Sequence, residues 1–349
     1  MSSIQVNVGV LKKLVELGQA VIIKKAGNPL FDNIEFSADQ NKIQVRATDG
    51  NSYITLVESG GFTEFEPILI NPAPLLGILK NIDDRRNITL VNDHSQLCID
   101  IGGKKPYVLR LATGGILPPN LTDSIVTKCA LGILKNLKLI ESAVEKEKSY
   151  VLLKLSKGLV SISATNGYKL AKLSQKTQSQ DSLSLTLDKG IASLASSLSP
   201  DTIEIDKGNR LIKISGLKGS IVTKQILDPI PDVDLVINNE PEHSLKVETE
   251  DMLRVIRRLQ SLNEDLVLKV SIKDNTISLS ADEVTVGSGE EELLTASIGN
   301  KKMVFYIKAS YFLQSLQNFD SVTIMYSNSV SPIFISGKDL LFVVMPVRV

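Results

Sequence analysis

The residues of this sequence whose types and spacing suggest chemistry are basic ones that recur on one side of helix-like stretches. When residues 127–144 are turned by about 100° per residue, Lys128, Lys135 and Lys138 lie opposite the apolar positions. The other stretches with this arrangement carry Lys12 and Lys13 (6–21), Lys189 (187–198), and Arg254, Arg257 and Arg258 (248–262). Solvation of exposed helix faces is the plain alternative, but the repetition favours binding to the phosphate backbone of a nucleic acid.

Patterns for catalysis or metal binding are weak in this sequence. His94 in "VNDHSQ" and His243 in "EPEHS" have no triad or metal-ligand spacing around them, and "IGGKKPY" lacks the spacing of a phosphate loop. Cys98 and Cys129 offer no disulfide framework and are expected to be small buried thiols. The sequence therefore predicts a protein without a catalytic site, cofactor or metal. The alternative is a three-domain hydrolase with unrecognised carboxylates, for which the acids of "IDDRR" (82–86) are the nearest candidates.

The composition is that of a cytoplasmic globular protein. The chain has 349 residues, of which 43% are apolar, so that two or three domains can each bury a core. Lys plus Arg and Asp plus Glu number 39 each, which argues against a uniformly basic protein but not against a basic patch. The first residues have no signal-peptide pattern, and no uncharged apolar stretch approaches the ~20 residues of a membrane span. We therefore expect no membrane association.

The elements that position the basic residues belong to a unit that recurs three times. The strand-like stretches "IQVRATDGNSYI", "VSISATNGYKLA" and "ISLSADEVTVG" are centred on Ala47, Ala164 and Ala281, which are each 117 residues apart. Around each stretch, the sequence predicts an opening amphipathic helix (from Val6, Thr127 and Glu248), a second short helix (from Asn71, Leu187 and Ile307) and several alternating strands. The fold class is therefore α+β, with domains at 1–122, 123–242 and 243–349 joined by the proline-containing stretches 114–123 and 227–243.

The buried faces of two of the opening helices follow from the same periodicity. Val10, Leu14, Leu17 and Val21 are expected to face the core in the first copy. In the second copy the expected face comprises Ala130, Ile133, Leu134, Leu137, Ile140 and Val144.

Several local sequences resemble the bacterial sliding clamp family, the β subunit of DNA polymerase III. "ATNGYKLA" (164–171) is similar to the family's A-T-D-G-H-R-L-A, Pro231-Asp232 to its "FPDY" joint, and "VVMPVRV" (343–349) to its "VVMPMRL" terminus. The resemblance covers the whole chain in the same order of elements. It implies three repeated clamp-type domains, each with two helices packed on antiparallel sheets, and a head-to-tail homodimer that closes a six-domain ring around duplex DNA.

The resemblance also implies residues for each surface of such a ring, and agrees with the basic helix faces. The DNA-facing set is Lys12, Lys13, Lys25, Lys80, Lys135, Lys138, Lys189, Arg254, Arg257 and Arg258. The set for a pocket that binds peptides is Thr165, Gly167, Tyr168, Lys169, Leu170, Pro231, Val236, Pro332, Val343, Met345, Pro346, Val347 and Arg348. The dimer seam would involve Tyr107, Leu109 and Leu262.

A family member would tether the DNA polymerase III α subunit, the clamp loader and other proteins with clamp-binding motifs, and would work in the cytoplasm on the nucleoid. Three departures from the family pattern bear on its partners: Asp234 and Leu235 replace basic residues, and Lys148 stands where a pocket leucine is expected. A divergent accessory clamp with its own partners is therefore an alternative to a main replicative clamp.

Overall fold

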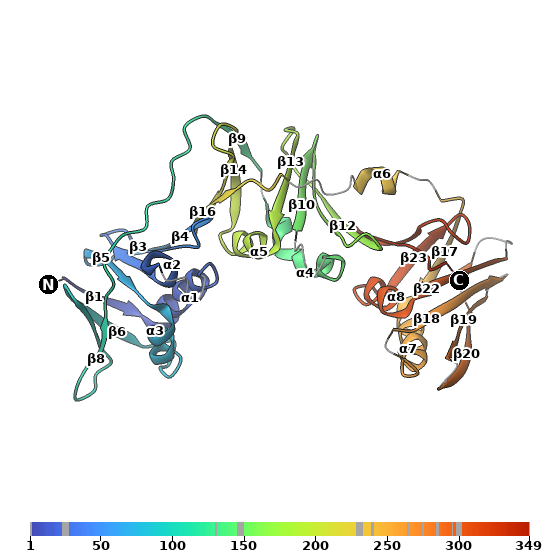
Figure 1. Cartoon of the computed structure of the whole chain (residues 1–349), viewed down its shortest axis with the longest axis horizontal. Coiled ribbons are helices and arrows are strands. Elements are labelled where there is room, and N and C mark those ends of the chain that lie inside the picture. Colours follow the sequence, from blue (N-terminus) through green and yellow to red (C-terminus); the bar gives the residue numbers. More distant parts are fainter. Residues whose placement is uncertain are drawn as a thin grey trace. The chain divides into compact units, whose positions relative to one another are not determined.

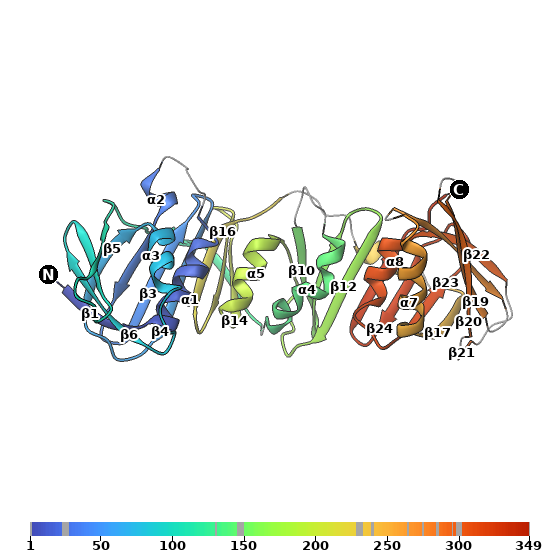
Figure 2. The same cartoon turned by 90° about the horizontal axis from the view of Figure 1, so that it is seen from below.

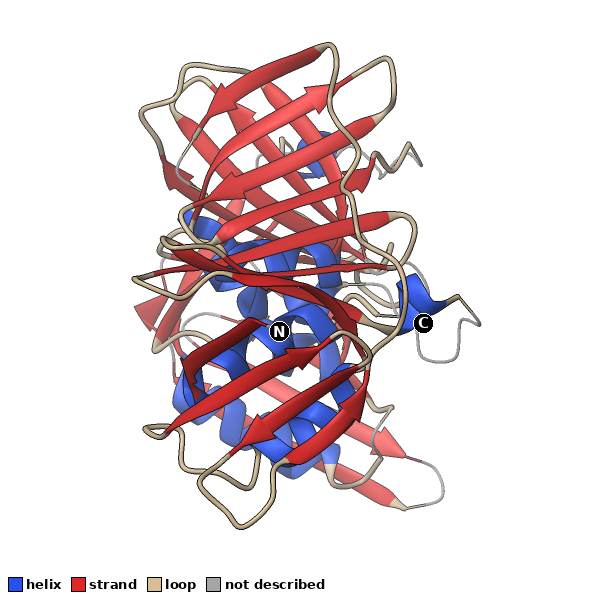
Figure 3. Cartoon of the chain, turned by 90° about the vertical axis from the view of Figure 1, so that its left-hand side faces the viewer, coloured by secondary structure: helices blue, strands red, loops and turns tan. Residues whose placement is uncertain are grey.

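The computed structural model describes residues 2–22, 28–129, 131–144, 150–227, 233–238, 241–263, 265–273, 276–283, 286–294, 296–297 and 302–348. The chain forms two compact units, one of residues Met1–Lys135 and Gly190–Ile226, the other of residues Asn136–Lys189 and Leu227–Val349. Strands are the commonest element, with short helices packed on them (Figure 3). No helix among the described residues is long and apolar enough to cross a membrane.

The first unit contains two antiparallel sheets. Their strand orders are β1-β6-β7-β8 and β5-β2-β3-β4-β16-β15-β14-β9. The strands are β1 (Ser2–Asn7), β2 (Ile34–Ala38), β3 (Lys42–Thr48), β4 (Ser52–Ser59), β5 (Phe65–Ile70), β6 (Asn87–Asp93), β7 (Gln96–Asp100), β8 (Tyr107–Arg110), β9 (Ser124–Lys128), β14 (Pro200–Asp206), β15 (Leu211–Gly216) and β16 (Gly219–Lys224). The helices are α1 (Val8–Gln19), α2 (Pro29–Asp32), α3 (Pro72–Leu79) and nearly all of α5 (Lys189–Ser197). Helices α1 and α3 lie side by side (Figures 1 and 2).

The second unit also contains two antiparallel sheets. Their orders are β13-β10-β11-β12-β25-β24-β23-β17-β21 and β20-β19-β18-β22. The strands are β10 (Tyr150–Ser156), β11 (Leu159–Thr165), β12 (Lys169–Lys176), β13 (Leu183–Asp188), β17 (His243–Glu248), β18 (Val267–Lys273), β19 (Thr276–Glu283), β20 (Gly287–Leu294), β21 (Ala296–Ser297), β22 (Met303–Lys308), β23 (Ser321–Tyr326), β24 (Ile333–Gly337) and β25 (Leu340–Val344). The helices are α4 (Leu137–Ile140), α6 (Val233–Ile237), α7 (Thr249–Gln260) and α8 (Ala309–Leu316), of which α7 and α8 pack together (Figure 2).

The alanine-centred strands predicted from the repeat are confirmed. Ala47 lies in β3, Ala164 in β11 and Ala281 in β19, and all three side chains are buried. Each strand forms a hairpin with the next, β3 with β4, β11 with β12 and β19 with β20. A small side chain at this place lets helices pack closely on the sheet, as Gly18 of α1 does against Val45 and Ala47.

The opening helices do not begin the copies, contrary to the prediction. Strand β1 precedes α1, and β17 precedes α7. Asn7 ends the first of these strands and caps the helix, because its side chain accepts a hydrogen bond from Val10 N at 3.2 Å. The short helix α2, whose N-cap is Asn28, likewise precedes strand β2.

The predicted opening helix of the second copy (127–144) is also wrong. Residues 124–128 form β9, followed by a 3₁₀ helix (Gly132–Asn136), the single turn of α4 and a second 3₁₀ turn (Glu141–Ala143). The amides of Cys129 and Leu131 donate to the carbonyls of Asp201 and Pro200, which holds this stretch extended where a helix would start. Gly132 and Asn136 are also poor helix formers. The expected buried side chains are buried from Ile133 to Ile140, while Val144 is half-buried and Ala130 lies outside the described residues.

The buried face of α1 is rotated from the expected one. Val8, Leu11, Leu14, Val15 and Gly18 are buried, whereas Val10 and Leu17 are half-exposed. These two residues line a cavity of about 330 Å³ together with Leu56, Leu198 and Lys218. The prediction for the thiols also needs correction, because Cys129 is buried but Cys98 is only half-buried.

Two buried carboxylates fix the joint at 114–123 to the first unit. Glu35 accepts hydrogen bonds from Ile116 N (2.7 Å) and Arg46 Nη1 (2.9 Å). Asp206 accepts from Thr122 N (3.0 Å) and from Asn209 N and Nδ2 (both 2.9 Å). The bonds from Asn209 and Thr122 hold the pKa of Asp206 well below its usual range.

Asp206→Asn should lower the melting temperature of the first unit at neutral pH, because an amide cannot accept all of these hydrogen bonds. The depressed pKa means that the stabilisation by Asp206 is present above the unfolded pKa of about 3.9 and is lost as the pH falls below it. The difference from the unchanged protein should therefore shrink below about pH 4. Thermal unfolding from pH 3 to 7 tests this, with the exposed Glu66→Gln as control. A constant difference at every pH would contradict it.

Candidate DNA-facing helices and peptide-binding surface

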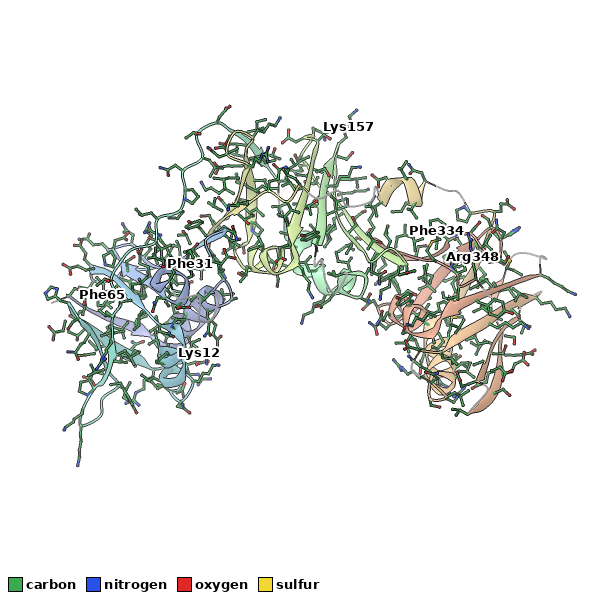
Figure 4. The ribbon with its side chains drawn as sticks, viewed as in Figure 1. Lys12, Phe31, Phe65, Lys157, Phe334 and Arg348 are labelled. Atoms are coloured by element: carbon green, nitrogen blue, oxygen red, sulfur yellow. The ribbon has the colours of Figure 1, made fainter. Side chains whose placement is uncertain are left out.

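The predicted DNA-facing residues lie on or beside helices, with their charges at the surface. Lys12 and Lys13 lie on α1, Lys80 caps the C-terminal end of α3, Lys135 and Lys138 follow β9, Lys189 begins α5, and Arg254, Arg257 and Arg258 lie on α7. Figure 4 shows Lys12 beside α1 and α3. The periodicity of residues 249–262 also predicts an apolar face of Met252, Val255, Ile256, Leu259 and Leu262 opposite the arginines; the first four are buried on α7, and Leu262 is half-buried after its end. Lys25 lies outside the described residues.

Acidic neighbours neutralise part of this basic surface. Lys12 pairs with Asp84 at 2.6 Å, Lys189 with Glu141, Arg254 with Asp251 at 3.0 Å, and Arg258 with Glu291. Glu291 raises the pKa of Arg258 in consequence. Among the described residues, no acidic side chain pairs with Lys13, Lys80, Lys135, Lys138 or Arg257. These five cations are therefore the best placed to meet phosphates.

Arg254→Glu combined with Arg257→Glu should weaken retention on DNA and leave the melting temperature unchanged, because both side chains lie on the exposed face of α7. Each lost phosphate contact should reduce the slope of log K against log salt by about 0.9. Arg257→Glu alone should account for most of the loss, since Arg254 already pairs with Glu250 and Asp251. Binding at several salt concentrations, with thermal unfolding in parallel, checks this. A collapse of the melting temperature would show that these arginines support the core instead.

The same tight turn closes two of the repeated hairpins. In the first copy, Thr48 Oγ1 accepts from Gly50 N, and Asp49 Oδ1 accepts from the amides of Asn51 and Ser52. In the second copy, Thr165 Oγ1 accepts from Gly167 N, and Asn166 Oδ1 from the amides of Tyr168 and Lys169. Gly50 and Gly167 have φ of 86° and 84°, a left-handed conformation that glycine adopts without strain.

The surroundings of the two turns differ. A Cβ placed on Gly50 would lie 2.9 Å from the ring of Phe31 of α2, which covers the first turn, whereas no atom of the described residues lies within 4 Å of a Cβ on Gly167. Tyr168, next to the open turn, is 66% exposed. An exposed tyrosine on a rigid, uncovered turn is well suited to contact a ligand. Phe31 is labelled in Figure 4.

Next to the open turn, an apolar row crosses four strands of the nine-stranded sheet. Leu170, Val343, Phe334 and Met325 are cross-strand neighbours on β12, β25, β24 and β23. Leu170, Val343 and Phe334 are buried together with Val233 of α6, while Val236 and Ile237 pack against them and remain partly exposed. Figure 4 labels Phe334. Helix α6 thus covers part of the row and leaves apolar side chains at its margin.

Helix α6 is attached to the sheet by charge as well as by packing. Asp234 pairs with Lys154 and, at 2.7 Å, with Lys172. Hydrogen bonds from these lysines hold the pKa of Asp234 below its usual range. At the two positions where the family has basic residues, this chain therefore has Asp234, which is paired with lysines of its own sheet, and Leu235, which is 72% exposed.

The C-terminal segment lies beside the same turn. Met345 N donates to Tyr168 O and Val347 N to Tyr306 O, both at 2.8 Å. Met345 is 38% exposed, Pro346 and Val347 are half-buried, and Arg348 is exposed (labelled in Figure 4). Half-buried Pro332 precedes β24.

The structure thus brings most of the predicted peptide-binding residues together, but it separates Lys169 from the others. Lys169 lies on the opposite face of β12 from Leu170 because successive strand residues alternate, and it packs toward α8. Pro231 and Lys148 lie outside the described residues. Sequence reasoning missed Val233 and Phe334. The spacing of Val233, Val236 and Ile237 fits a helix face, but the stretch is too short for this spacing alone to indicate α6.

The predicted seam residues lie on β8 and directly after α7. Tyr107 and Leu109 are on β8, which pairs with β7 and forms the edge of its sheet. Tyr107 is 49% exposed, and Leu109 is half-buried opposite Leu97. Leu262 follows α7 and is half-buried.

Comparisons with known proteins agree with this fold. Residues 235–348 match the family described as DNA polymerase III beta subunit, C-terminal domain. The chain is 23% identical over 357 residues to the beta sliding clamp of Chlamydia pneumoniae, covering 97% of this chain and 96% of that protein. It is 24% identical over 157 residues to the beta sliding clamp of Streptococcus pneumoniae TIGR4, where the match spans 42% of each chain.

Solved structures extend the likeness to the whole chain. A DnaN sliding clamp of Pseudomonas aeruginosa bound to griselimycin has a TM-score of 0.86 at 17% identity and 99% coverage of both chains. A Helicobacter pylori beta clamp bound to a DNA ligase peptide has a TM-score of 0.83 at 17% identity and full coverage of both. The fold is that of a sliding clamp. The last third of the chain matches the family of the DNA polymerase III β subunit, and the full length is similar to beta sliding clamps.

Proposed function

We propose that this chain is a sliding clamp that closes as a homodimeric ring around duplex DNA and tethers DNA polymerase III and other replication and repair proteins. The observation that carries the proposal is the likeness to clamps over the full length of the chain. The cations at helix surfaces support it, because contacts to phosphates are independent of base sequence and allow sliding. In this role the protein is a scaffold, and the reaction belongs to the enzymes it holds.

The peptide-binding function rests on the surface formed by the open turn at 165–168, the apolar row and the C-terminal segment. The Helicobacter pylori relative was solved with a DNA ligase peptide. We propose that the α subunit of the polymerase, the clamp loader and other motif-bearing proteins bind this surface, with Met345 as an apolar contact. The domains would be 1–122, 123–242 and 243–349, and the protein would work in the cytoplasm on the nucleoid.

Retention on circular and on linear DNA tests this function. The protein is loaded by the clamp loader of the same cells onto nicked circular DNA, purified by gel filtration, and the DNA is then cut once. A ring held by topology should stay on the circle and slide off the linear molecule. Equal retention on both, or a solution mass of 38.0 kDa instead of twice that value at micromolar concentration, would contradict the proposal.

A further inference from the structure

The first unit contains a cavity that the proposed function leaves unused. It has a volume of about 330 Å³ and lies where α1 meets the end of β4, the end of α5 and the turn between β15 and β16. Cavities that bind small molecules usually measure about 300–1,000 Å³. This one is therefore large enough for a small organic ligand.

The floor of the cavity is apolar. Val10, Leu14 and Leu17 contribute a stripe along α1, at the spacing of one helix face. Leu56 of β4 and Leu198, which follows α5, contribute to the rest of the lining, and both are buried. Val10 and Leu17 are half-exposed, so the stripe keeps apolar surface in contact with water. An apolar ligand would remove this surface from water, which is favourable.

The charged residues of the lining carry a net positive charge. Lys13 of α1 and Lys218 of the β15–β16 turn are exposed, and among the described residues neither pairs with an acidic side chain. Glu58, near the end of β4, is half-buried and is the one acid among the described residues that line the cavity. Two amines and one carboxylate leave one positive charge, which favours an anion.

The corresponding junction between the second and third copies has a different chemistry. In the first unit Val57 N donates to Lys218 O at 2.9 Å, and in the second unit Ser174 N donates to Asp339 O at 3.0 Å, so the two places are equivalent. A hydroxyl thus replaces the valine, and an acid replaces the lysine. Among the described residues of the second copy, the counterpart of α1 is broken into single turns and presents no such stripe. The apolar floor and the unpaired cations therefore occur together at the first junction.

We propose that this cavity binds a small anionic amphiphile, a molecule with an apolar body and one carboxylate, such as a medium-chain fatty acid. The apolar body would lie along Val10, Leu14 and Leu17, and the carboxylate would contact Lys13 and Lys218 at the rim. Duplex DNA does not have this chemistry, because its exposed anions are joined to polar sugars. The inference goes beyond the proposed function and uses no residue of the peptide-binding surface.

Titration calorimetry of the whole chain with decanoate, below the concentration at which it forms micelles, tests this proposal. Decanoate should bind as one molecule per chain. Octanoate should bind about fifteenfold more weakly, because it lacks two methylene groups that the cavity would bury. Decylammonium has the same apolar body and the opposite charge, and it should bind at least about tenfold more weakly than decanoate.

Variants of the lining locate the site. Lys13→Met and Lys218→Met should each weaken decanoate binding about tenfold, because each removes a hydrogen bond from a charged group and keeps an apolar stem. Lys12→Met is the matched control, since Lys12 is the neighbour on α1, pairs with Asp84 and lies outside the lining, so affinity should be unchanged. Leu17→Trp fills the cavity and should abolish binding. Should Leu17→Trp fail to fold, the two variants of exposed lysines decide the question.

Three results would overturn the inference. The first is that decanoate does not bind the intact protein. The second is that a folded Leu17→Trp protein binds it undiminished, because decanoate would then occupy another surface. The third is that decylammonium binds more tightly than decanoate and Glu58→Gln removes that binding, because the ligand would then be a cation. These measurements use neither DNA nor peptide, so their outcome is separate from that of the proposed function.

Discussion

Leu109→Asp should convert the protein into a monomer, with a mass of 38.0 kDa by sedimentation equilibrium at micromolar concentration. The unchanged protein should have twice that mass under the same conditions. Leu109 lies on β8, an edge strand with one pairing partner among the described residues. Such an edge presents unpaired amides and carbonyls to a second chain. Tyr107 is half-exposed on the same strand, so the edge is apolar as well.

The size of the effect follows from the burial of charge. An uncompensated carboxylate in an apolar interface costs about 3–5 kcal/mol. At about 1.4 kcal/mol for each factor of ten, dissociation should become a hundredfold to several thousandfold easier.

The matched control is Val126→Asp on β9, the edge strand of the other sheet in the same unit, where Val126 is 54% exposed. It makes the same chemical change on an apolar edge and should leave the dimer intact. Because Leu109 is half-buried, thermal unfolding of both variants must accompany the measurement. A folded Leu109→Asp protein with the mass of a dimer would show that the seam lies elsewhere.

Strong periodicity made part of the fold predictable from the sequence. The four buried apolar residues of α7 and the arginines opposite them follow directly from its 3.6-residue periodicity. This helix is long, with acids in its first turn and arginines in its last. The alanine strands were predictable because the same hairpin occurs at a constant interval. In contrast, the helix expected at 127–144 has equally good periodicity, but backbone bonds to Pro200 and Asp201 override it.

The parts of the site that escaped prediction depend on partners distant in sequence. Lys12 is neutralised by Asp84, 72 positions away, and Arg258 by Glu291, 33 positions away. Helix periodicity alone cannot indicate such pairs, so both side chains look like free cations in the sequence. The ring of Phe31 distinguishes the covered turn at Gly50 from the open one at Gly167, although the two local sequences are almost the same. Residues 233–237 are too short a stretch for periodicity to decide between helix and loop.

Removing residues 345–349 should weaken the binding of a polymerase-derived peptide at least about tenfold while the dimer persists. The truncation deletes the exposed side chain of Met345 and the two backbone bonds by which this segment joins Tyr168 to Tyr306. Full burial of a methionine side chain stabilises a complex by about 1.5–3 kcal/mol. Its loss therefore corresponds to an affinity lower by roughly tenfold to a hundredfold.

Met345→Ala separates the two contributions, because it keeps both backbone bonds and should lose affinity less than the truncation does. Leu217→Ala, at an 85% exposed leucine of the first unit, should bind the peptide normally. Peptide titration by fluorescence anisotropy measures the affinities, and sedimentation of the truncated protein should show a dimer, since the predicted seam uses β8 and the end of α7. If the truncated protein bound the peptide as well as the intact chain does, the binding surface would lie away from Tyr168. The exposed Leu235 on α6, next to the paired Asp234, would then be the first place to examine, because there the chain departs from the basic pattern of sliding clamps.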